Sequence, residues 1–323
     1  MNKANNPIVL MYHGITGKND AVANFDGKHI EAAKFEQQLQ YLLKHYSIIS
    51  IDDFLGWRVG KKKLPKNPVI LTFDDGYANC YTQLFHLLKK YNIPATIFLL
   101  TQHIGKKDPA WYDAITYCIA YTKERKMSIN TKKYSFKTEK EKFATLVVLK
   151  KVVLGSNQRD KLIREIAQAM RVDPKKCQDE DFLFCSWEQC QEMKEDKSAK
   201  ITFGSHSVTH QLMTGLSETE IEKEVQESKK IIEKRLKEEC NAFSYPFGSS
   251  NEMIRGVIEK SGYSCGFSTT YGKNTKETDV HVLKRIALNN LYDLPIFSLT
   301  LFFNFPLFHH WLLKQWSQIK KGF

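Results

Sequence analysis

The hydrophobic positions of the chain alternate between two kinds of segment. Short runs of β-branched and apolar residues recur, and each is followed by sequence with apolar residues at helical spacing. These runs cover residues 8–12, 69–73, 95–100, 201–203 and 242–245. Because strands that alternate with helices form parallel sheets, the pattern predicts an α/β fold in which helices cover a parallel sheet.

Two signals place the helices that cover this sheet. Apolar residues three or four positions apart predict helices near residues 35–46 and 84–91. Ser217 and Glu220 form a capping-box pattern, in which each side chain can bond the backbone amide of the other residue. We therefore expect a further helix to begin directly after Ser217.

The stretch from about residue 106 to 180 interrupts the alternation of strands and helices. It contains two predicted helices, at 139–154 and 158–172, and between Lys123 and Gln178 sixteen Lys and Arg residues stand against six Asp and Glu. Most of the net charge of +12 therefore lies in this segment. We predict one main domain over residues 1–290 with a basic helical insertion at about 106–180, followed by an apolar and basic tail at 291–323.

The positive charge of the insertion bears on the partners of the protein. It favours an anionic partner, such as a charged glycan, a phosphate-bearing lipid, a membrane surface or nucleic acid, and a solvated helical face is an equal alternative. The sequence contains no nucleic-acid recognition motif, so we expect no nucleic-acid partner.

The cysteines and the two chain ends indicate the compartment. The seven cysteines are scattered and contain no CxxC pair, which favours reduced thiols in a cytoplasmic protein. The first apolar run ends at His13 and Gly14, far short of a signal peptide. The Phe- and Leu-rich stretch at 295–313 is interrupted by polar residues, so we expect a packed or interfacial tail rather than a membrane span.

Two adjacent acids, Asp74 and Asp75, directly follow the predicted strand at 69–73. The carboxyl ends of parallel strands are where active sites gather, and two neighbouring carboxylates repel each other unless a cation or a shared proton relieves them. Taken alone, Asp-Asp-Gly is also a common turn at the start of a helix.

His206 and His210 follow the predicted strand at 201–203. Imidazoles four residues apart lie on one face of a helical turn, so we expect both to reach a single ion. With Asp75 they form a three-ligand site that leaves one position open for water, as in hydrolytic zinc sites. The neighbouring Asp74 could then accept a proton from that water.

Three motifs in this order resemble the polysaccharide deacetylases, the NodB-homology group of carbohydrate esterase family four. They lie at residues 72–77, 206–210 and 244–248, and the opening at 11–14 is also similar. The resemblance implies a distorted (β/α) barrel of about seven parallel strands that removes N-acetyl groups from sugars with a divalent metal, for which Zn²⁺ is expected.

The resemblance also implies roles for individual residues. Asp74 corresponds to the general base, and the backbone N–H of Phe247 corresponds to a donor that stabilises the oxyanion. The metal ligands that it implies are Asp75, His206 and His210.

Two departures from the family pattern affect the remaining site residues. Ser244 stands where many members have an arginine that orients the base, and we take Arg285 as the candidate replacement. The late histidine motif of the family has no good match, because His281 precedes the apolar pair rather than following it. His13 is the positional candidate for an acid or a substrate contact, and Tyr245 is a further candidate substrate contact within the third motif.

These observations predict a cytoplasmic, metal-dependent hydrolase that deacetylates an N-acetylated amino sugar in a polysaccharide or lipid-linked glycan, and that is peripheral at the inner membrane face. One alternative is an enzyme of the same fold that acts on a small non-sugar amide, and a glycan-sized groove beside the metal would favour the sugar. The other alternative is a metal- or glycan-binding protein with impaired catalysis, against which the presence of Asp74 argues.

Overall fold

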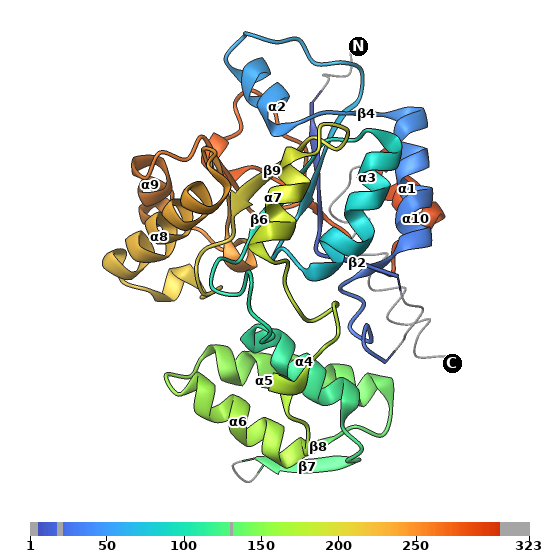
Figure 1. Cartoon of the computed structure of the whole chain (residues 1–323), viewed down its shortest axis with the longest axis vertical. Coiled ribbons are helices and arrows are strands. Elements are labelled where there is room, and N and C mark those ends of the chain that lie inside the picture. Colours follow the sequence, from blue (N-terminus) through green and yellow to red (C-terminus); the bar gives the residue numbers. More distant parts are fainter. Residues whose placement is uncertain (1–5, 18–21, 130–131, 304–323) are drawn as a thin grey trace.

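A parallel β-sheet lies at the centre of the molecule (Figure 1). The computed structural model describes residues 6–17, 22–129 and 132–303. The strands of the main sheet are β1 (Ile8–Tyr12), β4 (Ser47–Ile48), β5 (Pro68–Phe73), β6 (Ala95–Leu99), β9 (Ile201–Ser205), β10 (Ala242–Ser244), β11 (Cys265–Phe267) and β12 (Ile286–Ala287). All five predicted strands are confirmed. Every residue of β1 and β5 is buried, which explains why these strands are uniformly apolar rather than alternating.

The sheet curls into the expected distorted barrel of seven parallel strands. Their order is β11-β10-β9-β6-β5-β1-β12, and β4 pairs with the start of β5. The segment around β12 joins the two edges, because the Leu283 N–H bonds to the Gly266 carbonyl at 2.8 Å and the Leu288 N–H bonds to the Met11 carbonyl at 2.9 Å. The carboxyl ends of β1, β5, β6, β9 and β10 therefore open on the same side.

Helices cover the outside of this sheet. They are α1 (Ala32–His45), α2 (Ile51–Arg58), α3 (Phe85–Tyr91), α7 (Trp187–Glu195), α8 (Glu218–Leu236), α9 (Glu252–Lys260) and α10 (Leu294–Phe303). The predicted capping box is confirmed at the start of α8, where Ser217 and Glu220 bond each other's backbone amides. Ile221, Val225 and Ile232 are buried on one face of α8, so this face packs against the core.

The segment between β6 and α7 forms a second lobe below the barrel (Figure 1). Its elements are α4 (Trp111–Tyr121), β7 (Lys126–Ile129), β8 (Lys132–Ser135), α5 (Glu139–Leu154) and α6 (Arg159–Met170). The two predicted helices are confirmed as α5 and α6. The antiparallel hairpin of β7 and β8 was not predicted from the sequence, because each strand has only four residues and such a short alternation is a weak signal.

The apolar C-terminal stretch begins as α10, which packs against α1. Phe297 is fully buried and its ring lies 6.0 Å from that of Tyr41. Packing is therefore confirmed for this part of the tail, whereas residues 304–323 lie outside the described part. Among the described helices, none has the length and apolar character needed to cross a membrane.

Candidate active site

The predicted site residues meet at the carboxyl end of the barrel. Asp74 and Asp75 directly follow β5, His206 directly follows β9 and Ser244 ends β10. Parallel pairing of these strands brings their ends together, although the residues are far apart in the sequence. Arg285 directly precedes β12, and its side chain contacts Asp74 at the same end of the barrel.

Asp75, His206 and His210 form a compact set of buried metal-ligand atoms. The Asp75 Oδ1 atom lies 3.6 Å from His206 Nε2 and 3.7 Å from His210 Nε2, and the ligand atoms of the three residues lie within 4.8 Å of one another. His206 Nδ1 lies 2.8 Å from the Ser244 carbonyl oxygen. Because a carbonyl only accepts, Nδ1 carries a proton, and His206 Nε2 is the ring nitrogen on the side of Asp75, where a metal ion would bind.

The protonation of these residues suits a divalent metal. Burial lowers the pKa of His210 to about 3, so its imidazole is neutral at pH 7. Burial alone would raise the pKa of Asp75, but His210, His13, His206 and Lys28 together hold it below its ordinary value. Two imidazoles and one carboxylate, with a position left open, are the donor set of hydrolytic metal sites.

The two histidines lie on a bent loop, so the prediction of a helical turn is wrong. Residues 206–210 contain no helix, and Ser207 and His210 have positive φ angles of 68° and 56°. Glu224 of α8 fixes this loop by accepting hydrogen bonds from the backbone amides of Val208 and Thr209, both at 2.9 Å. The buried carboxylate of Glu224 replaces the backbone bonds that a helical turn would have made.

Left-handed backbone conformations are concentrated at this site. Besides the two in the histidine loop, Asp75 has φ 76° and Phe247 has φ 58°. Non-glycine residues rarely adopt this region because the Cβ atom approaches the backbone, and such strain is typical of functional sites. Of the two adjacent acids, Asp75 therefore has the left-handed conformation and Asp74 does not.

Arg285 holds the carboxylate of Asp74 in a bidentate ion pair. Each terminal guanidinium nitrogen donates to one Asp74 oxygen at 2.8 Å, and Arg285 Nη2 also donates to Ser244 Oγ at 2.9 Å. Burial would raise the pKa of Asp74, but the charge and hydrogen bonds of Arg285 together with His206 and His13 outweigh burial and leave the pKa below its ordinary value. Arg285 therefore supplies the cation that is missing at Ser244, and it contacts the predicted base directly.

A buried network beside Asp75 was not predicted from the sequence. Tyr112 of α4 donates to Asp75 Oδ1 at 2.9 Å, and Lys28 bonds both Asp113 of α4 and the Tyr77 hydroxyl. Burial would lower the pKa of Lys28, but Asp113 and other nearby carboxylates raise it. The insertion thus contributes side chains directly to the site. Lys28 gave no sequence signal, because it lies outside every regular element and outside every motif.

The remaining candidates, His13, Phe247 and Tyr245, have different surroundings in the structure. His13 lies at the site, where burial outweighs the neighbouring Asp75 and Asp74 and leaves its pKa below its ordinary value. The Phe247 ring packs 4.7 Å from that of His210. Tyr245 is fully buried and donates to the His281 carbonyl at 2.6 Å, so the prediction that it contacts substrate is wrong for its side chain. Its ring lies in the core because Tyr245 is extended and directly follows Ser244, whose side chain faces Asp74, and successive side chains of extended backbone point to opposite faces.

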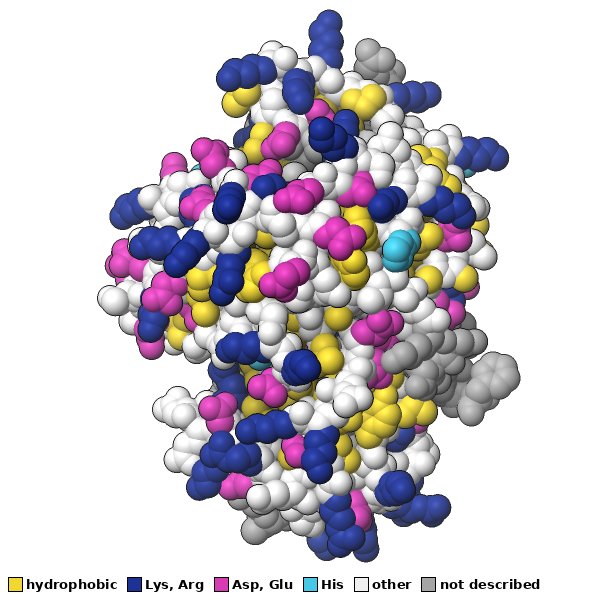
Figure 2. All heavy atoms as spheres, in the orientation of Figure 1, with side chains coloured by type: hydrophobic (Ala, Val, Ile, Leu, Met, Phe, Trp, Pro, Cys, Tyr) yellow, Lys and Arg dark blue, Asp and Glu magenta, His cyan; other side chains and the backbone are white. Residues whose placement is uncertain are grey.

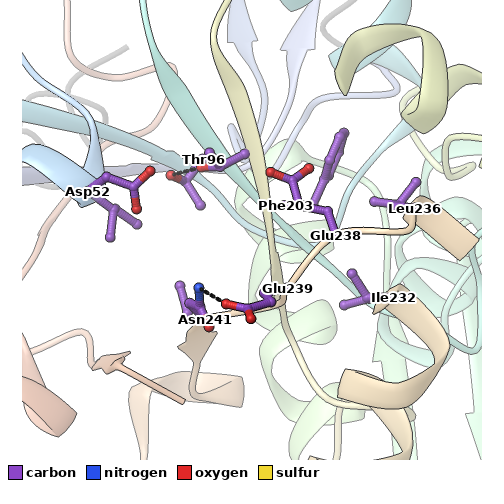
Figure 3. Close-up of a pocket in the computed structure, with 11 residues that line it drawn as sticks. Asp52, Thr96, Phe203, Ile232, Leu236, Glu238, Glu239 and Asn241 are labelled. Atoms are coloured by element: carbon purple, nitrogen blue, oxygen red, sulfur yellow. Dashed lines mark hydrogen bonds between the residues drawn. The ribbon is translucent and has the colours of Figure 1, made fainter. Parts of the chain in front are cut away.

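A separate pocket of about 270 Å³ lies at the opposite end of the barrel (Figure 3). It is lined by the first residues of β6, β9 and β10 and by three acids, Asp52, Glu238 and Glu239. Since the predicted site residues follow the carboxyl ends of these strands, the pocket is not part of the candidate site.

The comparisons with known proteins agree with this geometry. Residues 61–266, more than half of the chain, match the family model described as polysaccharide deacetylase. The chain belongs to this family. It is therefore a hydrolase of the polysaccharide deacetylase type, as predicted. Arg285, His13 and Lys28 lie outside the matched residues.

Individual relatives resemble the chain over most of its length. The poly-beta-1,6-N-acetyl-D-glucosamine N-deacetylase of Staphylococcus aureus is 23% identical, with 89% of this chain and 80% of the relative covered. The putative polysaccharide deacetylase YxkH of Bacillus subtilis is 22% identical, with 87% and 71% covered. Among solved structures, Streptococcus pyogenes deacetylase PplD matches with a TM-score of 0.62 at 19% identity, with 92% of this chain and 98% of that chain covered. IcaB from Ammonifex degensii matches with a TM-score of 0.60 at 17% identity, with 93% and 97% covered. These two structures support the fold.

Proposed function

We propose that the protein is a metal-dependent N-deacetylase of an N-acetylated amino sugar in a polysaccharide or lipid-linked glycan. The observation that carries the proposal is the separation of two adjacent carboxylates into different environments. Asp74 is paired with Arg285, whereas Asp75 faces the Nε2 atoms of His206 and His210. This arrangement supports Asp74 as the base and the other three residues as ligands, for which Zn²⁺ is the proposed metal.

The residues of the chain divide the reaction between them. When bound, the metal supplies polarisation of the acetamide carbonyl and lowers the pKa of water. Asp74 is ionised because Arg285 stabilises its charge, and its oxygens are held in a fixed orientation to accept a proton from the attacking water. The C–N bond then breaks, and His13 is our candidate to hold the proton that the departing amine takes.

The space next to the site supports a sugar over a small amide. A groove of about 710 Å³ is lined by Trp111 of α4 and by Thr209 and Gln211, the two neighbours of His210. Such a volume fits a chain of sugar units, whereas a small amide would fill little of it. The Staphylococcus aureus relative is a poly-beta-1,6-N-acetyl-D-glucosamine N-deacetylase, which supports the same substrate class.

Acetate release from N-acetylhexosamine oligosaccharides tests the proposal. We expect release by zinc-loaded protein, no release after metal removal, and a loss of about 100-fold or more in Asp74→Asn. Asp52→Asn, at the opposite end of the barrel, is the matched control and should retain activity. Release from small amides but from no sugar would refute the sugar substrate. Zinc binding without any hydrolysis would instead favour the protein with impaired catalysis.

We further propose a cytoplasmic location at the inner membrane face. The apolar side chains of α10 support the membrane location, because Phe302 is 73% exposed and Leu299 is 40% exposed. The net charge of +12 would favour an anionic membrane surface. Co-sedimentation with anionic liposomes at physiological salt tests this part. Absence of binding would refute the membrane association and leave the proposed reaction unaffected.

A further inference from the structure

The groove beside the candidate metal ligands lies between the insertion and the barrel. Its volume is about 710 Å³, and the starts of α4 and α6 form one side. The loop around Gln102 and His103 and the histidine loop form the other side. The groove therefore exists only because the insertion is present.

The groove begins next to the metal ligands, because the Trp111 ring contacts His210 and also lines the groove. The Trp111 indole N–H bonds to the His210 carbonyl at 3.5 Å, and the Trp111 ring lies 6.4 Å from that of Phe247. Trp111 also lines the groove, as do Thr209 and Gln211. A sugar whose acetamido group lies at the metal ligands would therefore extend its neighbouring substituents into the groove.

The charge of the groove is predominantly positive. Arg159, Lys161, Arg164 and Lys175 line it, against the two carboxylates of Asp108 and Asp160. Within the described residues, no carboxylate lies within 4.0 Å of any of these four cations, whereas Lys28, Lys62 and Lys90 all have such partners. In Figure 2, Lys and Arg side chains gather over the lower lobe, including where it meets the barrel.

Among these four cations, Arg159 is the one whose position is best defined by its contacts. Its guanidinium lies 5.1 Å from the centre of the Trp111 ring, and its buried Nε atom has no hydrogen-bond partner among the described residues. A guanidinium stacked on an aromatic face presents its outer nitrogens in a fixed plane, which matches the oxygens of a phosphate or carboxylate. Burial lowers the pKa of Arg159, and an anion bound there would offset this cost.

The start of α6 adds a second, independent preference for an anion. Arg159 is the first residue of this 12-residue helix, and no side chain caps the helix at Gln158. The free amides and the dipole of an uncapped helix start favour an anion, especially one with several oxygens. Two arginines, two lysines and a helix start together suit the charge of a phosphate group better than that of a single carboxylate.

We propose that the substrate carries a phosphate group and that this groove binds it while the N-acetyl sugar occupies the metal site. The inference rests on the proposed function and names its substrate class more narrowly. The phosphate could join sugar units within a glycan, or it could form the pyrophosphate of an activated sugar. Both present the same chemistry to Arg159 and Arg164.

Paired substrates test the proposal with zinc-loaded protein. Acetate release is compared between methyl N-acetylglucosaminide, which is neutral, and two phosphorylated forms of the same sugar, a phosphodiester-linked disaccharide and a nucleotide-linked pyrophosphate. We expect kcat/KM to be about tenfold or more higher for one phosphorylated form. Whichever form is preferred identifies the source of the phosphate.

Charge variants link this preference to the groove. The double variant Arg159→Ala with Arg164→Ala should bring the ratio of phosphorylated to neutral kcat/KM close to one. The control removes two exposed lysines from the hairpin of the same lobe, Lys126→Ala with Lys133→Ala, and should retain the ratio. A ratio near one in the unmodified protein, or a ratio that survives in the double variant, would overturn the proposal.

A binding measurement distinguishes failure of the phosphate proposal from failure of the proposed deacetylase function. If no acetate is released from any sugar, the deacetylase proposal fails. Calorimetry with inorganic pyrophosphate on the metal-free full chain then tests whether the groove binds phosphate. Binding that the double variant loses and the lysine control keeps would support the phosphate site. Absence of binding, or equal binding by the double variant, would overturn it.

Discussion

Replacing Arg285 with methionine removes the positive charge that faces the predicted base and keeps most of the side-chain volume. Arg285 is 1% exposed, and its guanidinium donates to both oxygens of Asp74, to Ser244 Oγ and to the Ser268 carbonyl. Methionine can replace none of these bonds. The variant would therefore leave a buried carboxylate without its cation.

The size of the effect follows from this burial. Removing one partner of a buried ion pair costs about 3–5 kcal/mol, because the other charge stays desolvated. We expect that loss in the free energy of unfolding of metal-free Arg285→Met at pH 8, measured by urea denaturation. Asp74→Asn combined with Arg285→Met should cost at least about 2 kcal/mol less than the sum of the two single changes, since both members of the pair are then neutral.

The effect also depends on pH. With Arg285 present, the pKa of Asp74 lies below its ordinary value, so the pair stabilises the protein above about pH 4 and loses this contribution as the pH falls through the lowered pKa. Without Arg285, burial raises the pKa of Asp74, so the variant regains stability as the pH falls through that raised value. The deficit of Arg285→Met should therefore shrink from pH 8 towards pH 5.

Activity provides a second measurement of the same pair. In zinc-loaded Arg285→Met, the acid limb of the pH profile of kcat/KM should move to higher pH, because the base is protonated over a wider range. A stability loss below about 1 kcal/mol that is constant with pH, together with an unshifted profile, would refute the assignment of Arg285 as the positioning residue of Asp74.

Three further substitutions test other parts of the site. Tyr112→Phe removes the hydroxyl bonded to the metal-ligand carboxylate and should weaken zinc binding about 10-fold to 100-fold in a chelator competition, while Tyr117→Phe on the same helix should not. Gly14→Ala places a Cβ atom 2.1 Å from a buried imidazole nitrogen and should cost about 1–3 kcal/mol of unfolding free energy, whereas Gly215→Ala, with nothing within 4 Å, should cost less than 1 kcal/mol. Glu224→Ala leaves two backbone amides of the histidine loop without their acceptor and should cost about 1–3 kcal/mol in urea denaturation and also weaken zinc binding. Unchanged zinc affinity in that variant would show that the loop keeps its shape without Glu224.

The sequence predicted those parts of the site that are carried by short contiguous motifs. Asp75, His206 and His210 each follow a strand whose apolar run is visible in the sequence, so the end of the barrel on which they meet could be inferred before the structure. Parallel pairing brings such strand ends together in any α/β barrel. Arg285 could be proposed because Ser244 stands where many members of the family have an arginine, so another cation was expected beside the base.

The rest depended on tertiary contacts that leave no local pattern. A spacing of four residues fits a helical turn, but positive φ angles at Ser207 and His210 and the carboxylate of Glu224 produce a bent loop instead. Neither serine nor histidine signals such a conformation as glycine would. Lys28 and Tyr112 reach the site from a loop and from the insertion, and only the folded chain shows that they do.

The position of Arg285 bears on how activity is inferred across the family. Judged by its third motif alone, which has Ser244 where many members have arginine, this protein would be taken to lack the cation that orients the base. The barrel brings strands that are far apart in the sequence to one carboxylate, so a cation that is absent from one strand can be supplied from beside another. Comparisons of such enzymes should therefore ask which atom fills a place in the site, and not only which residue stands at a position in the alignment.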